Sequence, residues 1–377
     1  MSSEVLSYRE ALKSVREILF ANVVMAGEIP APTGDEWRLT RFLSDRFTES
    51  GLDNIANDEA GNVAGVLSGK SATRNLLVAA HLDKIWSQND DHTVSVGVGE
   101  MSGRGVADNS LGIAALASLP LILQTLDIKL ESNLILLGTS RSFGRGNIGG
   151  MRFFLENSER EIESALCLEG ISLGRVSYTS LGMARGEISA VSKRADESAD
   201  GVVGVLADCV DVLLKIDRRE RPAATILVGG INAGSGFNVP PLFGTIRFEI
   251  RSESASKVAA LEKEIIRTVG GLLSEKDVSV GVEMVAHRNP GRLRPDHELV
   301  KSAESTLAEL GVETHDEPSI SELAALLEQK IPALTLGITE GGHRHSPQES
   351  IVLEPIFDGL AQVVSVLNFM DKECPKF

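Results

Sequence analysis

The hydrophobic and polar positions in the first part of the chain follow helical and strand patterns in alternation. Apolar residues recur at helical spacing in the longer segments, and the shorter segments are rich in apolar and β-branched residues. The pattern predicts helices at residues 8–26, 35–50 and 111–126 and strands at 61–67, 75–80, 133–137 and 165–169. Such alternation is typical of a layered α/β domain.

The order of the predicted elements changes after about residue 182. It becomes strand 184–191, helix 200–216, strands 223–231 and 242–251, helix 255–273 and strand 278–286. That βαββαβ order is typical of a ferredoxin-like unit. A helix at 296–310 and a strand at 333–336 then restore the α/β pattern. We therefore predict one discontinuous domain, residues 1–182 and 291–377, interrupted by an inserted domain at 183–290.

Charge and cysteine content narrow the range of partners. The chain has 37 basic and 53 acidic residues and a formal net charge of −16, which would not attract nucleic acid or an anionic membrane. Cys167, Cys209 and Cys374 are widely separated, so neither a disulfide framework nor a thiolate zinc site is predicted. The first residues lack the pattern of a signal peptide, and no run of about 18 apolar residues occurs. We expect a cytoplasmic protein with no nucleic-acid or membrane partner.

The first motif with chemical potential is the His-x-Asp of His81 and Asp83, at the end of a β-rich run. Side chains two residues apart in a strand point to the same side. Imidazole is a good zinc ligand, and a neighbouring carboxylate can fix its tautomer and raise its basicity. Taken alone, the motif also fits a structural histidine.

Three further features follow along the chain. Asp108 lies in a glycine-framed turn before an apolar helix, where an aspartate can also serve as a helix cap. Glu169 ends a strand, and His343 and His345 lie in the Gly-rich loop 341–349. A solvent-exposed carboxylate and a polar loop would explain these two features without a metal. Their joint occurrence in this order favours a metal site.

These motifs and the interrupted layout resemble the co-catalytic zinc exopeptidases related to aminoacylase, tripeptidase T and carboxypeptidase G (metallopeptidase family M twenty). The resemblance implies a three-layer α/β catalytic domain with a mixed central sheet and an inserted ferredoxin-like lid. It implies hydrolysis of amide bonds in small peptides or N-acyl amino acids. By resemblance, Asp83 orients His81, and the metal ligands are His81, Asp108, Glu169 and His345.

The resemblance also extends to the inserted domain. It implies that Asn238 and Arg251 bind substrate and that the protein forms a homodimer through the lid. A related zinc aminopeptidase family without a lid shares the aspartate turn, but it leaves residues 184–287 unexplained.

The family's catalytic Glu-Glu pair is missing from this chain. The 24 residues Ser132 to Leu155 contain no aspartate or glutamate, and they cover the segment where the pair should lie. By resemblance, Arg141 stands at the position of the general base and Ser142 at that of a second-metal ligand. The lid histidine that stabilises the oxyanion in the family is also absent, because no histidine occurs between His92 and His287. The active site is therefore predicted to be degenerate.

Other residues of the chain could replace the missing general base and the missing second-metal ligand. Arg141 or Arg145 could form an anion-binding arm, and Arg141 could neutralise Asp108 or bind substrate; both arginines could equally lie in a solvated turn. His343 could rescue a second metal site. Glu340 or Glu349 could replace the base.

The function predicted from the sequence is a hydrolase with weak or altered activity. We expect one zinc ion rather than two, or no metal at all, because the second set keeps only Asp108 and His345. The alternative is a pseudoenzyme, an inactive family member that binds a ligand or serves in an assembly. A third hypothesis is a hydrolase that uses a hydroxyl nucleophile, chosen from Thr139, Ser140 and Ser142.

Overall fold

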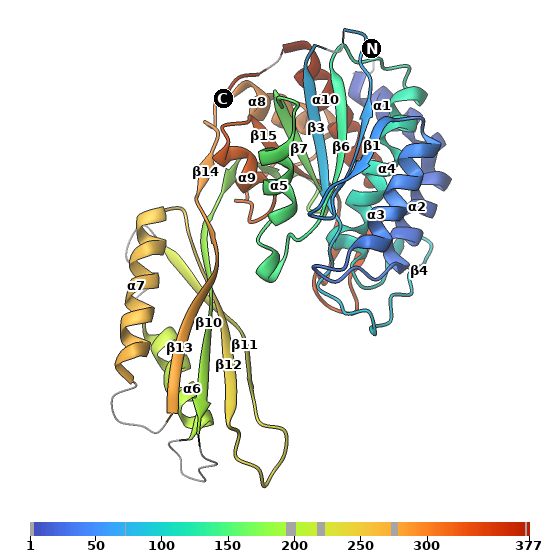
Figure 1. Cartoon of the computed structure of the whole chain (residues 1–377). Coiled ribbons are helices and arrows are strands. Elements are labelled where there is room, and N and C mark those ends of the chain that lie inside the picture. Colours follow the sequence, from blue (N-terminus) through green and yellow to red (C-terminus); the bar gives the residue numbers. More distant parts are fainter. Residues whose placement is uncertain (1–3, 72, 194–200, 217–222, 273–277, 374) are drawn as a thin grey trace. The chain divides into compact units, whose positions relative to one another are not determined.

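The structure is a computed structural model that describes residues 4–71, 73–193, 201–216, 223–272, 278–373 and 375–377. It divides into two compact units (Figure 1). The first unit comprises Met1–Thr179 and Arg292–Phe377, and the second comprises Ser180–Gly291. The two segments that join them carry the short strands β9 (Thr179–Ser180) and β14 (Gly291–Arg292).

A seven-stranded sheet forms the centre of the first unit, in the order β1-β2-β6-β3-β7-β15-β8. Strands β6, β3, β7 and β15 are parallel neighbours, whereas β1, β2 and β8 run antiparallel to the strands they pair with. The predicted mixed central sheet is confirmed. The strands are β1 (Asp53–Asn57), β2 (Val63–Leu67), β3 (Asn75–His81), β6 (Asn133–Thr139), β7 (Ser164–Ile171), β8 (Val176–Ser177) and β15 (Ala333–Thr339).

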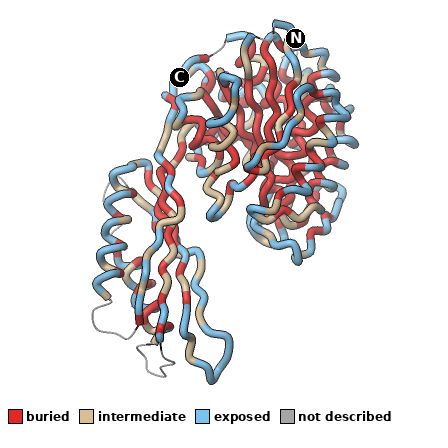
Figure 2. Tube along the Cα trace, in the orientation of Figure 1, coloured by how far each residue is buried: buried red, intermediate tan, exposed pale blue. Residues whose placement is uncertain are grey.

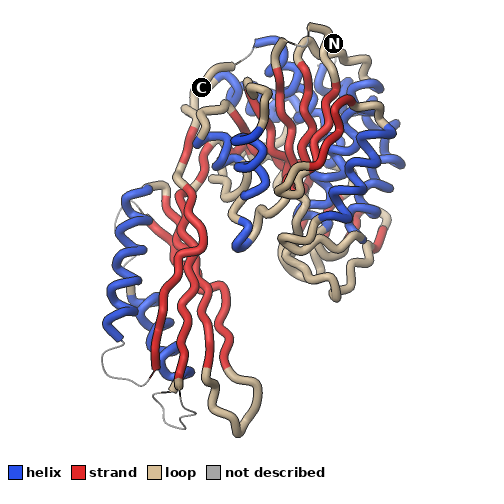
Figure 3. The backbone as a smooth tube through the Cα atoms, viewed as in Figure 1, coloured by secondary structure: helices blue, strands red, loops and turns tan. Residues whose placement is uncertain are grey.

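Helices cover both faces of this sheet, with α2, α3 and α4 on one side and α5 and α9 on the other (Figures 1 and 3). The helix predicted at 8–26 is in fact two helices separated by a 3₁₀ turn at Lys13–Val15. The helices are α1 (Glu4–Leu12), α2 (Arg16–Glu28), α3 (Trp37–Glu49), α4 (Leu111–Thr125), α5 (Gly149–Asn157), α8 (Glu298–Leu310), α9 (Leu323–Glu328) and α10 (Ile356–Glu373).

The core of the first unit lies along the parallel strands and α4 (Figure 2). Every residue of β6 and β15 is buried, as expected for parallel strands covered on both faces. Helix α4 is apolar on all sides and is buried along most of its length. Among the described residues, one helical stretch, Val106–Thr125, is long and apolar enough to cross a membrane, but it is 94% buried inside the protein. It is therefore a core helix.

A small second sheet holds the histidine-containing loop against an earlier part of the chain. Its order is β16-β17-β5-β4, and β17 pairs with β5. The amide of Gly103 donates to the carbonyl of Glu349 at 2.9 Å and extends this contact. The hydrophobic pattern did not predict these short strands, which are β4 (Ser95–Val96), β5 (Glu100–Ser102), β16 (Gly341–Gly342) and β17 (Ser350–Val352).

The second unit is an antiparallel four-stranded sheet with two helices, in the strand order β11-β12-β10-β13. The predicted ferredoxin-like βαββαβ order is confirmed. Two predicted helix ends, residues 200 and 273, lie outside the described residues. The elements are β10 (Gly182–Ser192), α6 (Val202–Lys215), β11 (Ala224–Ala233), β12 (Phe243–Ser252), α7 (Ala255–Gly271) and β13 (Val278–Arg288).

One edge of this sheet carries exposed apolar side chains. Strand β11 is an edge strand, and its Leu227 and Ile231 are 49% and 58% exposed. An unpaired edge of this kind can add a strand from another chain. Dimerisation through the unit stays a prediction.

An ion cluster lies on the sheet of the second unit. Glu249 on β12 is opposite Arg185 on β10, and its carboxylate accepts hydrogen bonds from Arg185 and Arg251. Burial alone would raise the pKa of Glu249, but the two guanidinium groups lower it below the ordinary value of 4.5. Because the native state then binds fewer protons than the unfolded state, the cluster stabilises the unit above about pH 4.5 and loses this contribution as the pH falls.

Glu249→Gln is expected to lower the free energy of unfolding of the second unit by about 1–3 kcal/mol at pH 7. The difference from wild type should shrink as the pH falls below 4.5, where the wild-type carboxyl also becomes neutral. Hydrogen exchange of β10 and β12 peptides between pH 3 and 7 would measure it. Glu264→Gln, on the exposed face of α7, is the matched control. An equal difference at all pH values would contradict the electrostatic account.

Candidate functional site

The carboxyl ends of the parallel strands bring the predicted site residues to one edge of the sheet. His81 is the last residue of β3 and pairs in register with Thr139, the last residue of β6. Ser142 therefore follows just beyond that edge. Glu169 lies in β7, which pairs with both β3 and β15. Ligands commonly bind at this edge of such sheets.

The turn that carries Asp108 is held by one side-chain hydrogen bond to β7 and one within the turn itself. The amide nitrogen of Asn109 donates to the carbonyl of Leu168 at 2.9 Å. The hydroxyl of Ser110 donates to the carbonyl of Gly105 at 2.7 Å. The two donor residues directly precede α4, and their hydrogen bonds hold Asp108 beside the end of β7.

Four predicted metal ligands come together in one cluster. Nε2 of His81 lies 3.0 Å from Oδ1 of Asp108, and Nε2 of His345 lies 2.7 Å from Oδ2 of the same carboxylate. Potential ligand atoms of His81, Asp108 and Glu169 all lie within 4.8 Å of one another. These three residues are buried, whereas the side chain of His345 is 47% exposed.

Asp83 lies beside His81, and its role in orienting the imidazole stays a prediction. Its Oδ2 accepts hydrogen bonds from Thr33 Oγ1 at 2.7 Å and from the Phe143 amide at 2.8 Å. Nδ1 of His81 lies 3.1 Å from the main-chain carbonyl oxygen of Asp83 and 3.6 Å from its Oδ1. The Phe143 ring packs edge-on against the imidazole of His81, with centroids 5.1 Å apart.

The electrostatics of the cluster favour charged forms despite burial. Burial raises the pKa of Asp108, but its contacts with the two histidines and Arg344 lower it well below its usual value. Burial lowers the pKa of His81, but its contacts with Asp108 and Asp83 raise it well above its usual value. The positively charged groups around Asp108 thus keep its carboxylate ionised.

The arginine beside Asp108 is Arg344, not Arg141 as the sequence suggested. Nε of Arg344 donates to Oδ2 of Asp108 at 2.8 Å, and Nη2 donates to Oε2 of Glu169 at 3.2 Å. Arg344 stands between the two histidines of the loop that the sequence analysis singled out. The two histidines were predicted as ligands from the sequence, but a role for the arginine between them was not.

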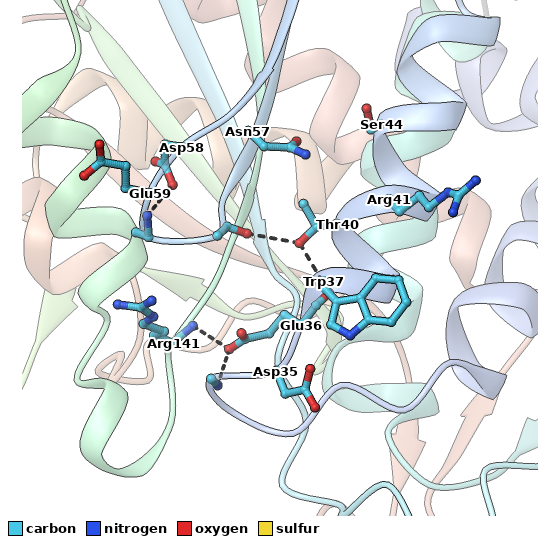
Figure 4. A pocket seen from close by; sticks show the side chains of 13 residues that line it. Asp35, Glu36, Trp37, Thr40, Arg41, Ser44, Asn57, Asp58, Glu59 and Arg141 are labelled. Atoms are coloured by element: carbon cyan, nitrogen blue, oxygen red, sulfur yellow. Dashed lines mark hydrogen bonds between the residues drawn. The ribbon is translucent and has the colours of Figure 1, made fainter.

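Arg141 instead lines a cavity of about 470 Å³ (Figure 4). Its main-chain amide donates to Oε1 of Glu36 at 2.9 Å, and the same oxygen accepts from the Gly34 amide at 2.8 Å. Burial raises the pKa of Glu36, although these two amides oppose the shift. Substrate binding by Arg141 and an anion-binding role for Arg141 or Arg145 stay predictions.

A buried carboxylate that the sequence analysis missed lies behind Ser142. Glu322 precedes α9 and is 3% exposed, and its Oε1 accepts a hydrogen bond from the Ser142 hydroxyl. Burial raises its pKa, and its charge interacts with both His81 and Glu169. Glu322 belongs to no recognisable motif, and its neighbours in space come from distant segments. No signal in the sequence pointed to it.

The other residues considered from the sequence lie outside the cluster. The side chain of His343 is exposed, as is that of Glu340. Glu349 is buried and accepts a hydrogen bond from the Gly105 amide, and burial raises its pKa to about 7. In the second unit, Asn238 is exposed between β11 and β12, and Arg251 pairs with Glu249.

Comparison with known proteins identifies the family. The model of peptidase family M20/M25/M40 matches residues 77–368, which include every member of the cluster. The chain belongs to this family. The M20 resemblance predicted from the motifs is thereby confirmed. No sequence among the curated proteins matches this one.

Solved structures of M20-like enzymes share the fold. The dipeptidase Dug1p from Saccharomyces cerevisiae is 14% identical, with a TM-score of 0.83 and coverage of 99% of both chains. A tripeptidase from Staphylococcus aureus is 18% identical, with a TM-score of 0.75 and coverage of 95% of this chain and 99% of its own. A dinuclear metal-binding M20 peptidase from Bacillus subtilis is 16% identical, with a TM-score of 0.60 and coverage of 93% and 99%.

The donor set of the cluster fits a metal ion. One imidazole and two carboxylates are ligands that zinc accepts, and they leave a position open for water or substrate. Within the described residues, Oδ1 of Asp108 is buried and accepts no hydrogen bond of good geometry. It faces Nε2 of His81, which is a bare acceptor when Nδ1 donates to Asp83. Two acceptors in contact require a proton or a cation between them.

Asp83→Asn is expected to weaken zinc binding about 10–100-fold, because the variant removes the charge that supports the His81 imidazole. Isothermal titration of the metal-free protein with zinc would measure the change. Asp91→Asn, at an exposed aspartate eight positions later, should bind zinc as wild type does. If Asp83→Asn binds zinc with unchanged affinity and stays folded, the role assigned to Asp83 is wrong.

Proposed function

We propose that this chain is a metal-dependent hydrolase of amide bonds in small peptides or N-acyl amino acids, with one metal ion on His81, Asp108 and Glu169. The observation that carries the proposal is the buried cluster whose ligand atoms lie within 4.8 Å of one another. Membership of a peptidase family supports the class of reaction. The similar structures named as a dipeptidase and a tripeptidase support small peptides as substrates.

The residues of the chain have separate tasks in this proposal. Zinc, when bound, would polarise the scissile carbonyl and lower the pKa of a water ligand. Asp83 holds His81 in the tautomer that leaves Nε2 free, and Phe143 covers the imidazole on one side. His345, beside Oδ2 of Asp108, stands at the open side of the cluster, where it can donate a hydrogen bond to a substrate oxygen.

A carboxylate is still needed to accept the proton of the attacking water, because Arg141 and Ser142 stand where the family resemblance implies glutamates. Glu322 is the candidate that its surroundings favour. The Ser142 hydroxyl holds its Oε1, and its charge acts on His81 and Glu169. Burial raises its pKa, which suits a general base that works near neutral pH.

A second function is favoured by a different observation. Arg344 forms ion pairs with both Asp108 and Glu169, so its guanidinium neutralises these carboxylates in the absence of a metal ion. A cleft of this kind could bind a peptide or another carboxylate ligand without turnover, or serve in an assembly. This inactive alternative predicts ligand binding that does not depend on zinc.

Assays of dipeptides and N-acetyl amino acids separate the two functions. With zinc, cobalt or manganese added, the wild type is expected to turn over at least one substrate, and His81→Ala should reduce turnover to background. His315→Ala, at an exposed histidine outside the cluster, is the matched control. Absence of turnover with every metal, together with zinc-independent ligand binding, would support the inactive alternative and refute the hydrolase.

Glu322→Gln is expected to lower kcat by about 10²–10⁴-fold if Glu322 replaces the lost base. Zinc content should not change, because Glu322 is not a member of the proposed ligand set. Glu340→Gln is the matched control, since Glu340 is an exposed glutamate near the same loop and was an alternative base. A wild-type kcat in Glu322→Gln would exclude Glu322 as the general base. A loss of kcat in Glu340→Gln would assign that role to Glu340 instead.

A further inference from the structure

The guanidinium of Arg344 bridges two carboxylates from different elements. Nε binds Oδ2 of Asp108 at 2.8 Å, and Nη2 binds Oε2 of Glu169 at 3.2 Å. Both acceptors are buried, with side chains 1% and 6% exposed. The side chain of Arg344 is itself 36% exposed, yet its guanidinium reaches both buried acids at once.

The two oxygens of Asp108 have different surroundings. Oδ2 accepts from both Arg344 and His345, at 2.8 and 2.7 Å. Oδ1 lies 3.0 Å from His81 and accepts no hydrogen bond of good geometry within the described residues. The oxygen of Asp108 that faces the 341–349 loop therefore accepts two hydrogen bonds, whereas the oxygen that faces His81 has only the close contact with the imidazole.

The charge that Arg344 contributes can be compared with the charge of the second metal site in a two-metal relative. In a two-metal relative, a divalent ion and its glutamate ligand together contribute a net charge of +1. Here Ser142 stands at the position of that glutamate by resemblance, and Arg344 contributes +1 without a metal ion. Arg344 thus supplies a positive charge beside Asp108, which a buried carboxylate requires.

We propose that Arg344 is a tethered cation that takes the place of a second metal ion and limits the cluster to one divalent metal. The inference rests on the metal-binding part of the proposed function and adds a residue that sets the number of ions. The loop 341–349 then supplies both His345 and the competing cation. A planar guanidinium suits this task, because its fixed donors can reach two carboxylates together.

Zinc titration of metal-free protein tests the inference without an activity assay. Calorimetry and metal analysis after dialysis should give one zinc ion per chain for wild type. Arg344→Gln should bind a second zinc ion per chain. Arg344→Lys keeps the positive charge and should therefore still bind one zinc ion, although a lysine lacks the fixed donors that reach both carboxylates. Arg294→Gln, which removes an arginine whose side chain is 81% exposed and pairs with Asp296, is the matched control.

The outcomes distinguish this inference from the proposed function. One zinc ion in both wild type and Arg344→Gln, at whatever affinity, would overturn the role of Arg344 and leave a single-metal hydrolase standing. Two zinc ions in wild type would also overturn it. No zinc in either protein would refute the proposed metal site, and the inference with it. Circular dichroism of each variant confirms that the compared proteins are folded.

Discussion

The site depends on one constraint, which is that the Asp108 carboxylate has been removed from water. A buried charge is costly unless opposite charges and hydrogen bonds replace its hydration. His81, His345 and Arg344 supply that compensation from two separate segments, and together they hold the pKa of Asp108 well below its usual value. The loop 341–349 is therefore held in place by Asp108 as much as by its own short strands.

The central sheet makes this arrangement possible. Parallel strands end at one edge, so β3, β6 and β7 deliver His81, the turn after Thr139 and Glu169 to the same place. The turn before α4 then needs only the bond from Asn109 to β7 to bring Asp108 into the group. The interior of the sheet is apolar and buried, and the polar site residues lie at the carboxyl ends of its strands.

The sequence predicted the parts of the fold and site that periodicity and motif spacing encode. The mixed sheet, the βαββαβ unit and the M20 family are confirmed, and His81, Asp108, Glu169 and His345 lie together. Arg344 and Glu322 were missed for physical reasons. An arginine in a polar loop has the same local pattern whether it faces water or a buried acid, and Glu322 meets Ser142 only through folding over 180 positions. Short strands such as β4 and β16 contain too few residues to show the alternation of apolar and polar positions that identifies a strand.

If Glu322 acts as the proposed base, its charge links metal binding to proton transfer. Burial and the nearby charge of Glu169 both raise the pKa of Glu322, whereas positive charge on His81 lowers it. A cation bound at Oδ1 of Asp108 would also favour the ionised form of Glu322, since an opposite charge nearby stabilises a carboxylate. The base would then become competent when the metal is present. Losing the acids of residues 132–155 need not abolish chemistry, provided that a carboxylate from another segment is charged by the same ion.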